Sequence, residues 1–174
     1  MLSALSLCIL LAQRDTISLV AVGDMMIGTN FPDASYLPPN DGNDIFEPVK
    51  PLLLKADVTF GNLEGVILSG NGTVKKCNDI KNCYAFKSPD HYIKHYINAG
   101  FDVLSIANNH IGDFGQAGRN NTAKILQENQ MPFAGTLDFP FTTFIKDSVI
   151  YGFCAFAPNS GTMNINDTAL IRKV

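Results

Sequence analysis

Three short apolar segments constrain the fold of this 174-residue chain, because each is followed by a cluster of polar residues. The segments have the length and the β-branched content of buried strands. They span residues 17–22, 57–60 and 103–107, and lead into Gly23-Asp24, Gly61-Asn62-Leu63-Glu64 and Asn108-Asn109-His110. Open α/β sheets place their binding sites outside the carboxyl ends of parallel strands. The sequence therefore predicts an α/β fold with a largely parallel sheet and a site where these strands end.

Apolar residues at helical or alternating spacing predict the remaining elements. Asp44 is expected to cap a helix through residue 56, and Ser88-Pro89 to begin a second one that ends at Gly100. The other predicted elements are a strand-like segment at 84–86, a helix at 115–129, a strand at 131–134, a hairpin from 139–145 and 149–157, and a helical segment at 167–174. This order favours a single α/β domain.

The third polar cluster admits two interpretations. Asn108, Asn109, His110 and Asp113 lie within six residues and can converge on a metal ion or a phosphate group. The alternative is a polar strand-to-helix loop in which Asn and Asp serve as turn formers and helix caps. Asp24 and Glu64 follow what should be neighbouring strands, and this coincidence favours the site.

His91 and His95 form a second candidate, since an i, i+4 pair can bind zinc on one helix face. Their neighbours on that face are tyrosines, and the glutamate of the metalloprotease pattern is absent. A structural role is therefore favoured for both histidines.

The N-terminal segment bears on localisation. Leu2–Ala12 is apolar or small throughout, but it is shorter than the roughly 20 residues that cross a bilayer. Its length suits the apolar region of a secretory signal, although no Lys or Arg precedes it. We expect residues 1–14 to be a signal-peptide remnant, residues 15–174 to form the domain, and the protein to act in the periplasm or cell envelope, with membrane association only through this leader. A buried helix or strand is the alternative.

Cysteine spacing points in the same direction. Cys77 and Cys83 bracket a polar loop and can close a disulfide in an oxidising compartment. A metal-binding pair is less favoured because no further Cys or His follows at ligand spacing. Cys154 lies in an apolar run and is expected to be a small core residue.

Charge argues against nucleic acid as a partner. The net charge is −3, and no cluster of Lys or Arg is larger than Lys75-Lys76. Binding to a phosphate backbone needs a concentrated basic surface.

Four segments together resemble the bacterial CapA, or poly-γ-glutamate capsule biosynthesis, family, a branch of the calcineurin-like metallophosphoesterases. They are VAVGDMMIG, DVTFGNLEG, GFDVLSIANNHIGDFG and YGFCAFAPN, and the resemblance extends over residues 16–166. It implies a metallophosphoesterase-like β-sandwich flanked by helices, a role in capsule synthesis or export, and divalent metal ions such as Mn, Zn or Fe.

The same resemblance assigns roles to individual residues. Asp24 stands at the first aspartate ligand, and Asn62 and Glu64 occupy the segment that carries the bridging ligand. Asn109 stands at the asparagine ligand, and His110 at the histidine that protonates the leaving group. Asp113 is the residue expected to orient His110. In such enzymes two metals clamp the phosphate and a bound water is the nucleophile.

Two departures limit what the resemblance implies. Met26 stands where the superfamily has a histidine, and an amide at Asn62 bridges two cations poorly. The superfamily also takes further histidine ligands from its second half, which has no counterpart in this sequence. We therefore expect an N-terminal portion of a longer sandwich that cannot hold two metals by itself.

Three functions remain open from the sequence. The first is a capsule synthesis or export protein whose pocket binds an anionic polymer or phosphoester and which works with the capsule machinery. The second is an active metal-dependent phosphoesterase or polymer hydrolase of the cell envelope. The third is a non-functional gene fragment, because half a sandwich would leave an apolar sheet face uncovered.

Overall fold

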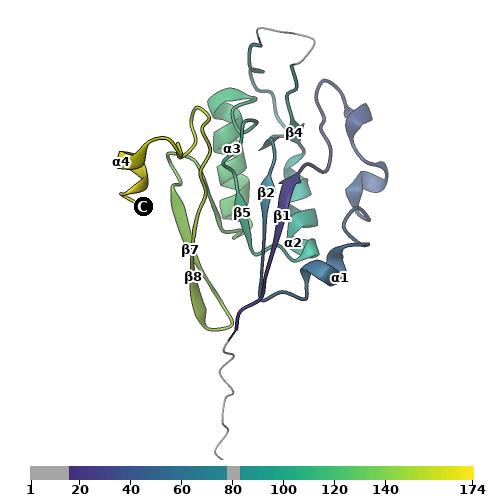
Figure 1. The fold of residues 1–174 in the computed structure, drawn as a ribbon. Helices are drawn as coiled ribbons and strands as arrows, with labels where there is room; N and C mark the ends of the chain where they lie inside the picture. Colours follow the sequence, from purple (N-terminus) through teal and green to yellow (C-terminus); the bar gives the residue numbers. More distant parts are fainter. Residues whose placement is uncertain (1–15, 78–82) are drawn as a thin grey trace, which may run out of the picture.

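A four-stranded parallel sheet lies at the centre of the computed structural model, which describes residues 16–77 and 83–174 (Figure 1). Its strands, in spatial order, are β1 (Leu19–Met25), β2 (Val58–Leu63), β5 (Val103–Ser105) and β6 (Phe133–Ala134). Every neighbouring pair is parallel. The predicted α/β class with a parallel sheet is confirmed, and the architecture is consistent with a metallophosphoesterase-like fold. The predicted signal-peptide remnant, residues 1–14, lies outside the described residues.

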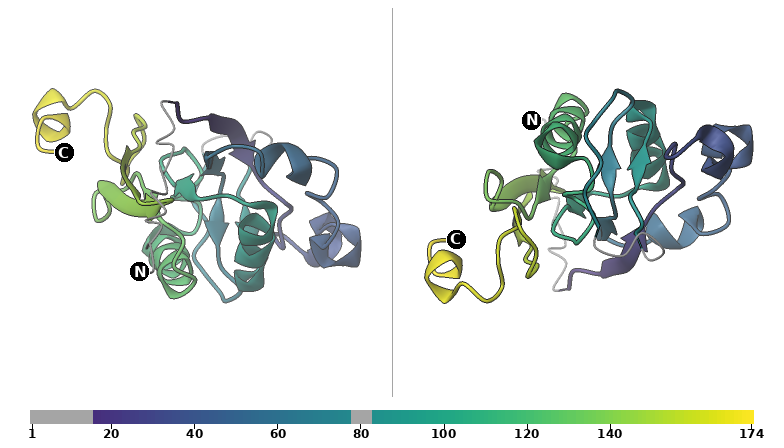
Figure 2. Two further views of the ribbon diagram at one scale, coloured as in Figure 1. Left: turned by 90° about the horizontal axis from the view of Figure 1, so that it is seen from below. Right: turned by 90° about the horizontal axis from the view of Figure 1, so that it is seen from above.

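Two helices cover one side of this sheet, as Figure 2 shows from both ends. They are α2 (Ile93–Ala99) and α3 (Gly115–Glu128). The shorter helical segments are η1 (Ala34–Tyr36), η2 (Pro39–Gly42), α1 (Lys50–Leu53), η4 (Asp90–Tyr92) and α4 (Thr168–Ile171). Within residues 16–77 and 83–174, none of the helices has the length and apolarity needed to cross a bilayer.

The hydrophobic core fills the space between the sheet and these two helices. Leu104 from β5 and Leu126 from α3 are completely buried, and Ile93 from α2 is 1% exposed. Burial of one such side chain stabilises the fold by roughly 1.5–3 kcal/mol. The core therefore holds the carboxyl end of β5 at a fixed distance from its neighbours.

Two small sheets complete the structure. β3 (Val66–Ile67) pairs in parallel with β4 (Lys87–Ser88), and β7 (Phe141–Lys146) forms an antiparallel hairpin with β8 (Val149–Cys154). The hairpin contacts the main sheet through the rings of Phe153 and Phe60, whose centroids are 5.7 Å apart. It lies beside the parallel sheet in Figure 1.

Three local predictions differ from the structure. The first strand continues through Asp24 to Met25 and is an edge strand, so Leu19 is 61% exposed rather than buried. The predicted 44–56 helix is α-helical only in α1, because Pro48 and Pro51 carry no amide hydrogen for the helical ladder. Residues 84–86 are not a strand, and pairing begins one residue later, in β4.

The end of α2 agrees with prediction. Gly100 caps the helix in the left-handed conformation, with φ of 95°, which glycine adopts without a steric penalty.

Cys154 also differs from its predicted core position, since it is exposed at the end of β8, where the alternating strand turns it away from the sheet.

Candidate functional site

The polar residues predicted from the sequence meet at the carboxyl ends of β1, β2 and β5. Asp24 on β1 pairs in register with Asn62 on β2, and Asn62 pairs with Ser105 at the end of β5. The register shifts between Val22 and Asp24, and this irregularity places Asp24 opposite Asn62. Parallel pairing therefore brings together side chains that are far apart in the sequence.

The Asn62 amide links the two carboxylates of this cluster. Its Nδ2 donates a hydrogen bond to Asp24 Oδ1 at 2.8 Å and another to Glu64 Oε2 at 2.8 Å. Two carboxylate acceptors determine which end of the amide faces them, because an amide oxygen there would be repelled. Asp24 and Glu64 thus share one donor between them.

Asn108, and not Asn109, is the asparagine that belongs to this cluster. Asn108 is 6% exposed, and its Nδ2 donates to Leu63 O at 2.8 Å and to Asn62 Oδ1 at 3.3 Å. Its Oδ1 accepts a hydrogen bond from the backbone N–H of His110 at 2.9 Å. Asn109, which the family resemblance places at the asparagine ligand, is exposed. Two adjacent asparagines give no local signal that distinguishes them, because the turn made by Asn108 sets their directions.

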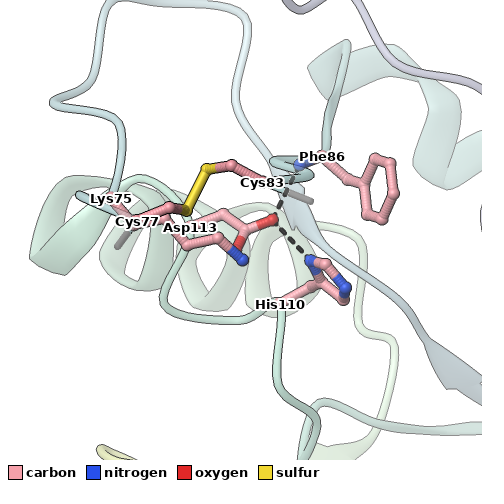
Figure 3. Close-up of a disulfide and its surroundings, with 6 residues drawn as sticks. All are labelled: Lys75, Cys77, Cys83, Phe86, His110 and Asp113. Atoms are coloured by element: carbon pink, nitrogen blue, oxygen red, sulfur yellow. Dashed lines mark hydrogen bonds and ion pairs between the residues drawn. A yellow bond between two sulfur atoms is a disulfide. The ribbon is translucent and has the colours of Figure 1, made fainter. Parts of the chain in front are cut away.

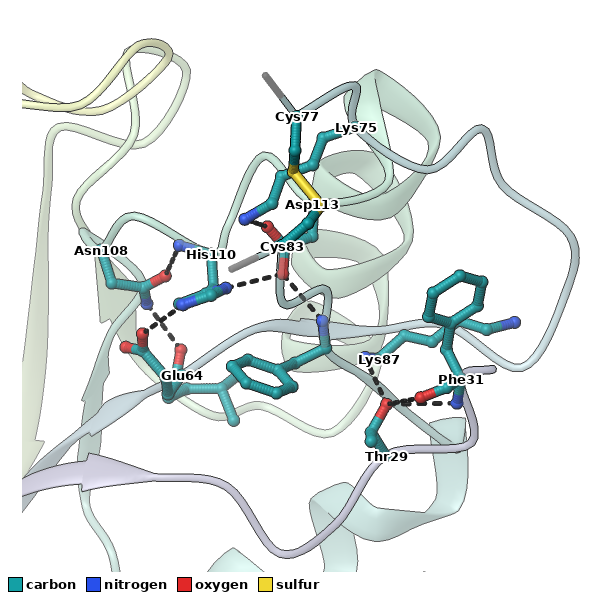
Figure 4. Close-up of polar contacts among 12 residues, drawn as sticks. Thr29, Phe31, Glu64, Lys75, Cys77, Cys83, Lys87, Asn108, His110 and Asp113 are labelled. Atoms are coloured by element: carbon teal, nitrogen blue, oxygen red, sulfur yellow. Dashed lines mark hydrogen bonds and ion pairs between the residues drawn. A yellow bond between two sulfur atoms is a disulfide. The ribbon is translucent and has the colours of Figure 1, made fainter. Parts of the chain in front are cut away.

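His110 and Asp113 form a pair on the loop between β5 and α3. His110 Nδ1 lies 2.7 Å from Asp113 Oδ2, and Asp113 is completely buried (Figure 4). An ionised aspartate only accepts hydrogen bonds, so the pairing assigns the proton to Nδ1. His110 Nε2 is then the ring nitrogen that faces Glu64, 3.7 Å from Oε1.

The electrostatics of the cluster are dominated by two carboxylates, the partly buried Glu64 and the exposed Asp24. Burial raises the pKa of the Glu64 carboxyl above its usual value, and the charge of Asp24 raises it further. His110 and the hydrogen bond from Asn62 act in the opposite direction without cancelling the rise. A raised carboxyl pKa beside a second carboxylate identifies a place where a positive charge would be stabilised.

Phe86 and Lys75 are part of the site, although no sequence motif indicated either residue. The backbone N–H of Phe86 donates to Asp113 Oδ2 at 2.7 Å, and its ring lies 4.5 Å from the His110 ring between centroids. Lys75 Nζ lies 2.6 Å from Asp113 Oδ1, an ion pair at an angle that is poor for a hydrogen bond. Only the spatial proximity of the two segments reveals these contacts.

A disulfide joins the segments that carry these two residues. Cys77 and Cys83 are bonded in the structure, with Cα atoms 5.7 Å apart, next to Lys75 and Phe86 (Figure 3). The sequence predicted this pairing as a local loop closure. The structure places it over the His110–Asp113 pair.

The other two histidines lie away from the cluster. His91 Nε2 pairs with Asp41 Oδ2 at 2.7 Å, whereas His95 is 9% exposed and packs against the Tyr92 ring with centroids 5.0 Å apart. Their side chains have separate partners.

The donor atoms of the cluster can be compared with the needs of a divalent metal. Carboxylate and amide oxygens with one imidazole suit Mn²⁺, Zn²⁺ or Fe²⁺. However, no three His, Cys, Asp or Glu side chains gather as a metal-binding group anywhere in residues 16–77 and 83–174. Asp24 and Glu64 are therefore the two charged oxygen donors that this cluster offers to a cation.

The fold and the cluster define a class of protein: an α/β protein of metallophosphoesterase-like architecture with a polar site at the strand ends. Residues 18–139 match the family model described as "Bacterial capsule synthesis protein PGA_cap", and the chain belongs to this family.

Individual relatives agree. The chain is 30% identical over 180 aligned residues to "Capsule biosynthesis protein CapA" of Bacillus anthracis, an alignment that covers 93% of this chain and 42% of the relative. Two proteins of Sinorhizobium fredii (strain NBRC 101917 / NGR234), "Uncharacterized protein y4sH" and "Uncharacterized protein y4uA", are each 34% identical over 125 residues, which cover 70% of this chain and 25% of each relative. The chain thus spans less than half the length of the curated relatives it matches.

Proposed function

We propose that this protein serves the synthesis or export of an anionic capsule polymer of the poly-γ-glutamate type, together with other components of the capsule machinery. Its proposed pocket, the polar cluster of Asp24, Asn62 and Glu64 at the ends of β1, β2 and β5, would bind one divalent cation and, with it, an anionic group of the polymer. The convergence of Asp24 and Glu64 on the single Asn62 amide carries this proposal. The name of the Bacillus anthracis relative supports the capsule assignment.

Charge explains why a cation belongs in the proposal. A carboxylate or phosphate ligand that approached Asp24 and Glu64 directly would be repelled, since burial and then the charge of Asp24 already raise the pKa of the Glu64 carboxyl. A divalent cation between protein and ligand converts this repulsion into attraction. When bound, such an ion would also polarise a phosphoryl or carbonyl oxygen of the ligand. Asp24 and Glu64 would hold it, with His110 at the edge of the pocket.

Cation binding can be measured by isothermal titration of the 174-residue chain with Mn²⁺ and with Zn²⁺. We expect one site. Asp24→Asn or Glu64→Gln should weaken it at least tenfold, about 1.4 kcal/mol, because each removes a charged ligand. Glu128→Gln is the matched control, since Glu128 is an exposed carboxylate on α3 that pairs with Lys124.

Three results would contradict parts of the proposal. If the wild-type chain bound no cation, or bound it equally well without Asp24 and Glu64, the pocket would not be the site. Two tight sites would disprove the single-cation arrangement. If poly-γ-glutamate bound equally strongly in the presence of Mn²⁺ and of a chelator, the cation would not bridge the protein and the polymer.

A metal-dependent phosphoesterase or polymer hydrolase is the second candidate. The observation that favours it is the His110–Asp113 pair, which holds a proton on Nδ1 and directs Nε2 towards the pocket. In its imidazolium form His110 would donate the Nε2 proton to the leaving oxygen and become a neutral imidazole whose remaining proton stays on Nδ1. Phosphodiesterase activity with Mn²⁺ that falls at least a hundredfold in His110→Ala would support this function. Activity that His110→Ala left unchanged would exclude the catalytic role.

We also propose that the protein acts outside the cytoplasm, in the periplasm or cell envelope. The Cys77–Cys83 disulfide supports this localisation, because disulfides persist in oxidising compartments and are rare in the cytosol. Fractionation of the native host followed by thiol labelling tests it. The protein should appear in the envelope fraction with Cys77 and Cys83 unlabelled until reductant is added.

A further inference from the structure

The buried Asp113 carboxylate is held by one short stretch of chain. Lys75 contacts Asp113 twice: its Nζ lies 2.6 Å from the carboxylate oxygen Oδ1, and its backbone N–H donates to the backbone carbonyl oxygen of Asp113 at 2.7 Å. The backbone N–H of Phe86 donates to Oδ2 at 2.7 Å, beside His110 Nδ1 at 2.7 Å (Figure 3). Each carboxylate oxygen therefore has its own set of partners.

This division of partners determines the direction of His110. A carboxylate held at only one oxygen can rotate, and a buried charge without a cation is costly. Lys75 supplies the cation at Oδ1, so Oδ2 remains directed at Phe86 N and at the imidazole. The side chain of Lys75 is 29% exposed, whereas that of Asp113 is fully buried. Lys75 therefore places a positive charge between the buried aspartate and the solvent.

The disulfide explains how Lys75 and Phe86 stay together. Cys77 lies two residues after Lys75, and Cys83 lies three residues before Phe86. The covalent bond closes the chain between them, which reduces the freedom of both segments to leave Asp113. Figure 4 shows the disulfide, Lys75 and Asp113 stacked above His110 and Glu64.

We propose that Lys75 is a positioning residue for His110, acting through Asp113, and that the Cys77–Cys83 disulfide keeps Lys75 in place. The inference rests on the proposed function in so far as His110 faces the proposed pocket. Lys75 does not contact a ligand in this role. It maintains the hydrogen bond from His110 Nδ1–H to Asp113 Oδ2, and this bond keeps His110 Nε2 directed at the proposed pocket.

The hydrogen-bonded Nδ1 proton of His110 is a readout that a merely structural lysine would not affect. In ¹⁵N-labelled protein it should be visible by NMR as a slowly exchanging ring proton, assigned by its loss in His110→Ala among the three histidines. Lys75→Met should accelerate its exchange at least tenfold. Lys75→Arg, which keeps the charge, should restore slow exchange, and Lys76→Met, the exposed neighbour, should leave it unchanged.

A second variant keeps the test decisive if Lys75→Met does not fold. Cys77→Ser/Cys83→Ser retains the lysine but removes its support, and it should accelerate exchange of the same proton. Slow exchange in Lys75→Met would overturn the positioning role of Lys75. Slow exchange in the double serine variant would overturn the supporting role of the disulfide. A wild type that binds no cation would contradict the proposed function alone, because the NMR comparison requires no ligand.

Discussion

At the scale of single residues, the site depends on a few side chains whose directions are set by turns. Asn108 is turned into the cluster by its bond to the His110 N–H, and its neighbour Asn109 is left exposed. Gly65 makes a comparable contribution just after β2. It follows Glu64 directly and has φ of +89°, a conformation that side chains with a Cβ rarely adopt.

Replacement of Gly65 by alanine should destabilise the fold by about 1–3 kcal/mol. The new Cβ would meet Phe86 Cβ at 2.9 Å and Phe86 O at 3.0 Å, so it would also displace the segment that covers His110. Urea unfolding measures the loss. Gly70→Ala is the control, because a Cβ there meets nothing within 4 Å. Equal stabilities of the two variants would show that this turn is not constrained as described.

The raised pKa of Tyr92 predicts that the stability of the fold depends on pH in the alkaline range. Burial, followed by the nearby Asp41 charge, raises the pKa of Tyr92 from 10.0 to about 12. The unfolded chain therefore loses this proton at lower pH than the folded chain does. The stability that Tyr92 contributes is fully present below pH 10.0 and is lost as the pH rises towards about 12.

Tyr92→Phe should make the fall in unfolding free energy over this alkaline range less steep, as followed by urea titrations at several pH values. Some dependence should remain, because burial also raises the pKa of Tyr96. Tyr84→Phe is the control, since Tyr84 is 60% exposed. Identical slopes for wild type and Tyr92→Phe would disprove the contribution of this tyrosine.

At the scale of elements, the parallel sheet brings the ends of β1, β2 and β5 together, and one ion pair attaches the β7–β8 hairpin to it. Lys146 Nζ lies 2.7 Å from both oxygens of Asp102, and Asp102 Oδ2 also accepts from Thr59 N at 2.8 Å. The aspartate thus joins β2, the start of β5 and the hairpin.

Lys146→Met should release the hairpin from the sheet at a cost of up to about 1 kcal/mol, because the ion pair is partly exposed. Amides of β7 and β8 should exchange faster in hydrogen–deuterium exchange, while those of β5 should change little. Lys124→Met, which removes an exposed i, i+4 pair on α3 with atoms 3.8 Å apart, is the control. Unchanged hairpin exchange in Lys146→Met would show that ring packing alone attaches it.

At the scale of the whole molecule, apolar side chains remain exposed on the elements that α2 and α3 do not cover. Leu19 on the edge strand β1 is 61% exposed, and the cross-strand partners Ile145 and Ile150 on the hairpin are 72% and 73% exposed. Exposed apolar groups on an edge strand or hairpin promote association between molecules.

The double variant Ile145→Thr/Ile150→Thr should therefore reduce self-association, measured by sedimentation velocity over a range of concentrations. Threonine keeps the β-branched shape, so the unfolding free energy should change by less than about 1 kcal/mol. Ile165→Thr is the control, because Ile165 is 55% exposed outside the hairpin. If the double variant left self-association unchanged, the association would occur through another surface.

The sequence by itself determined the α/β class, the parallel strands and the neighbourhood of Asp24, Glu64 and His110, because apolar runs that end in polar residues define strand ends locally. It also identified the Cys77–Cys83 pair as a loop closure. Only the tertiary structure decided that Asn108 faces the cluster, that Asn62 donates to both carboxylates, and that Lys75 and Phe86 hold Asp113. These features depend on strand register and on contacts between segments distant in the sequence. Local periodicity carries no information about either, because it records which face of an element is apolar and not what lies against it.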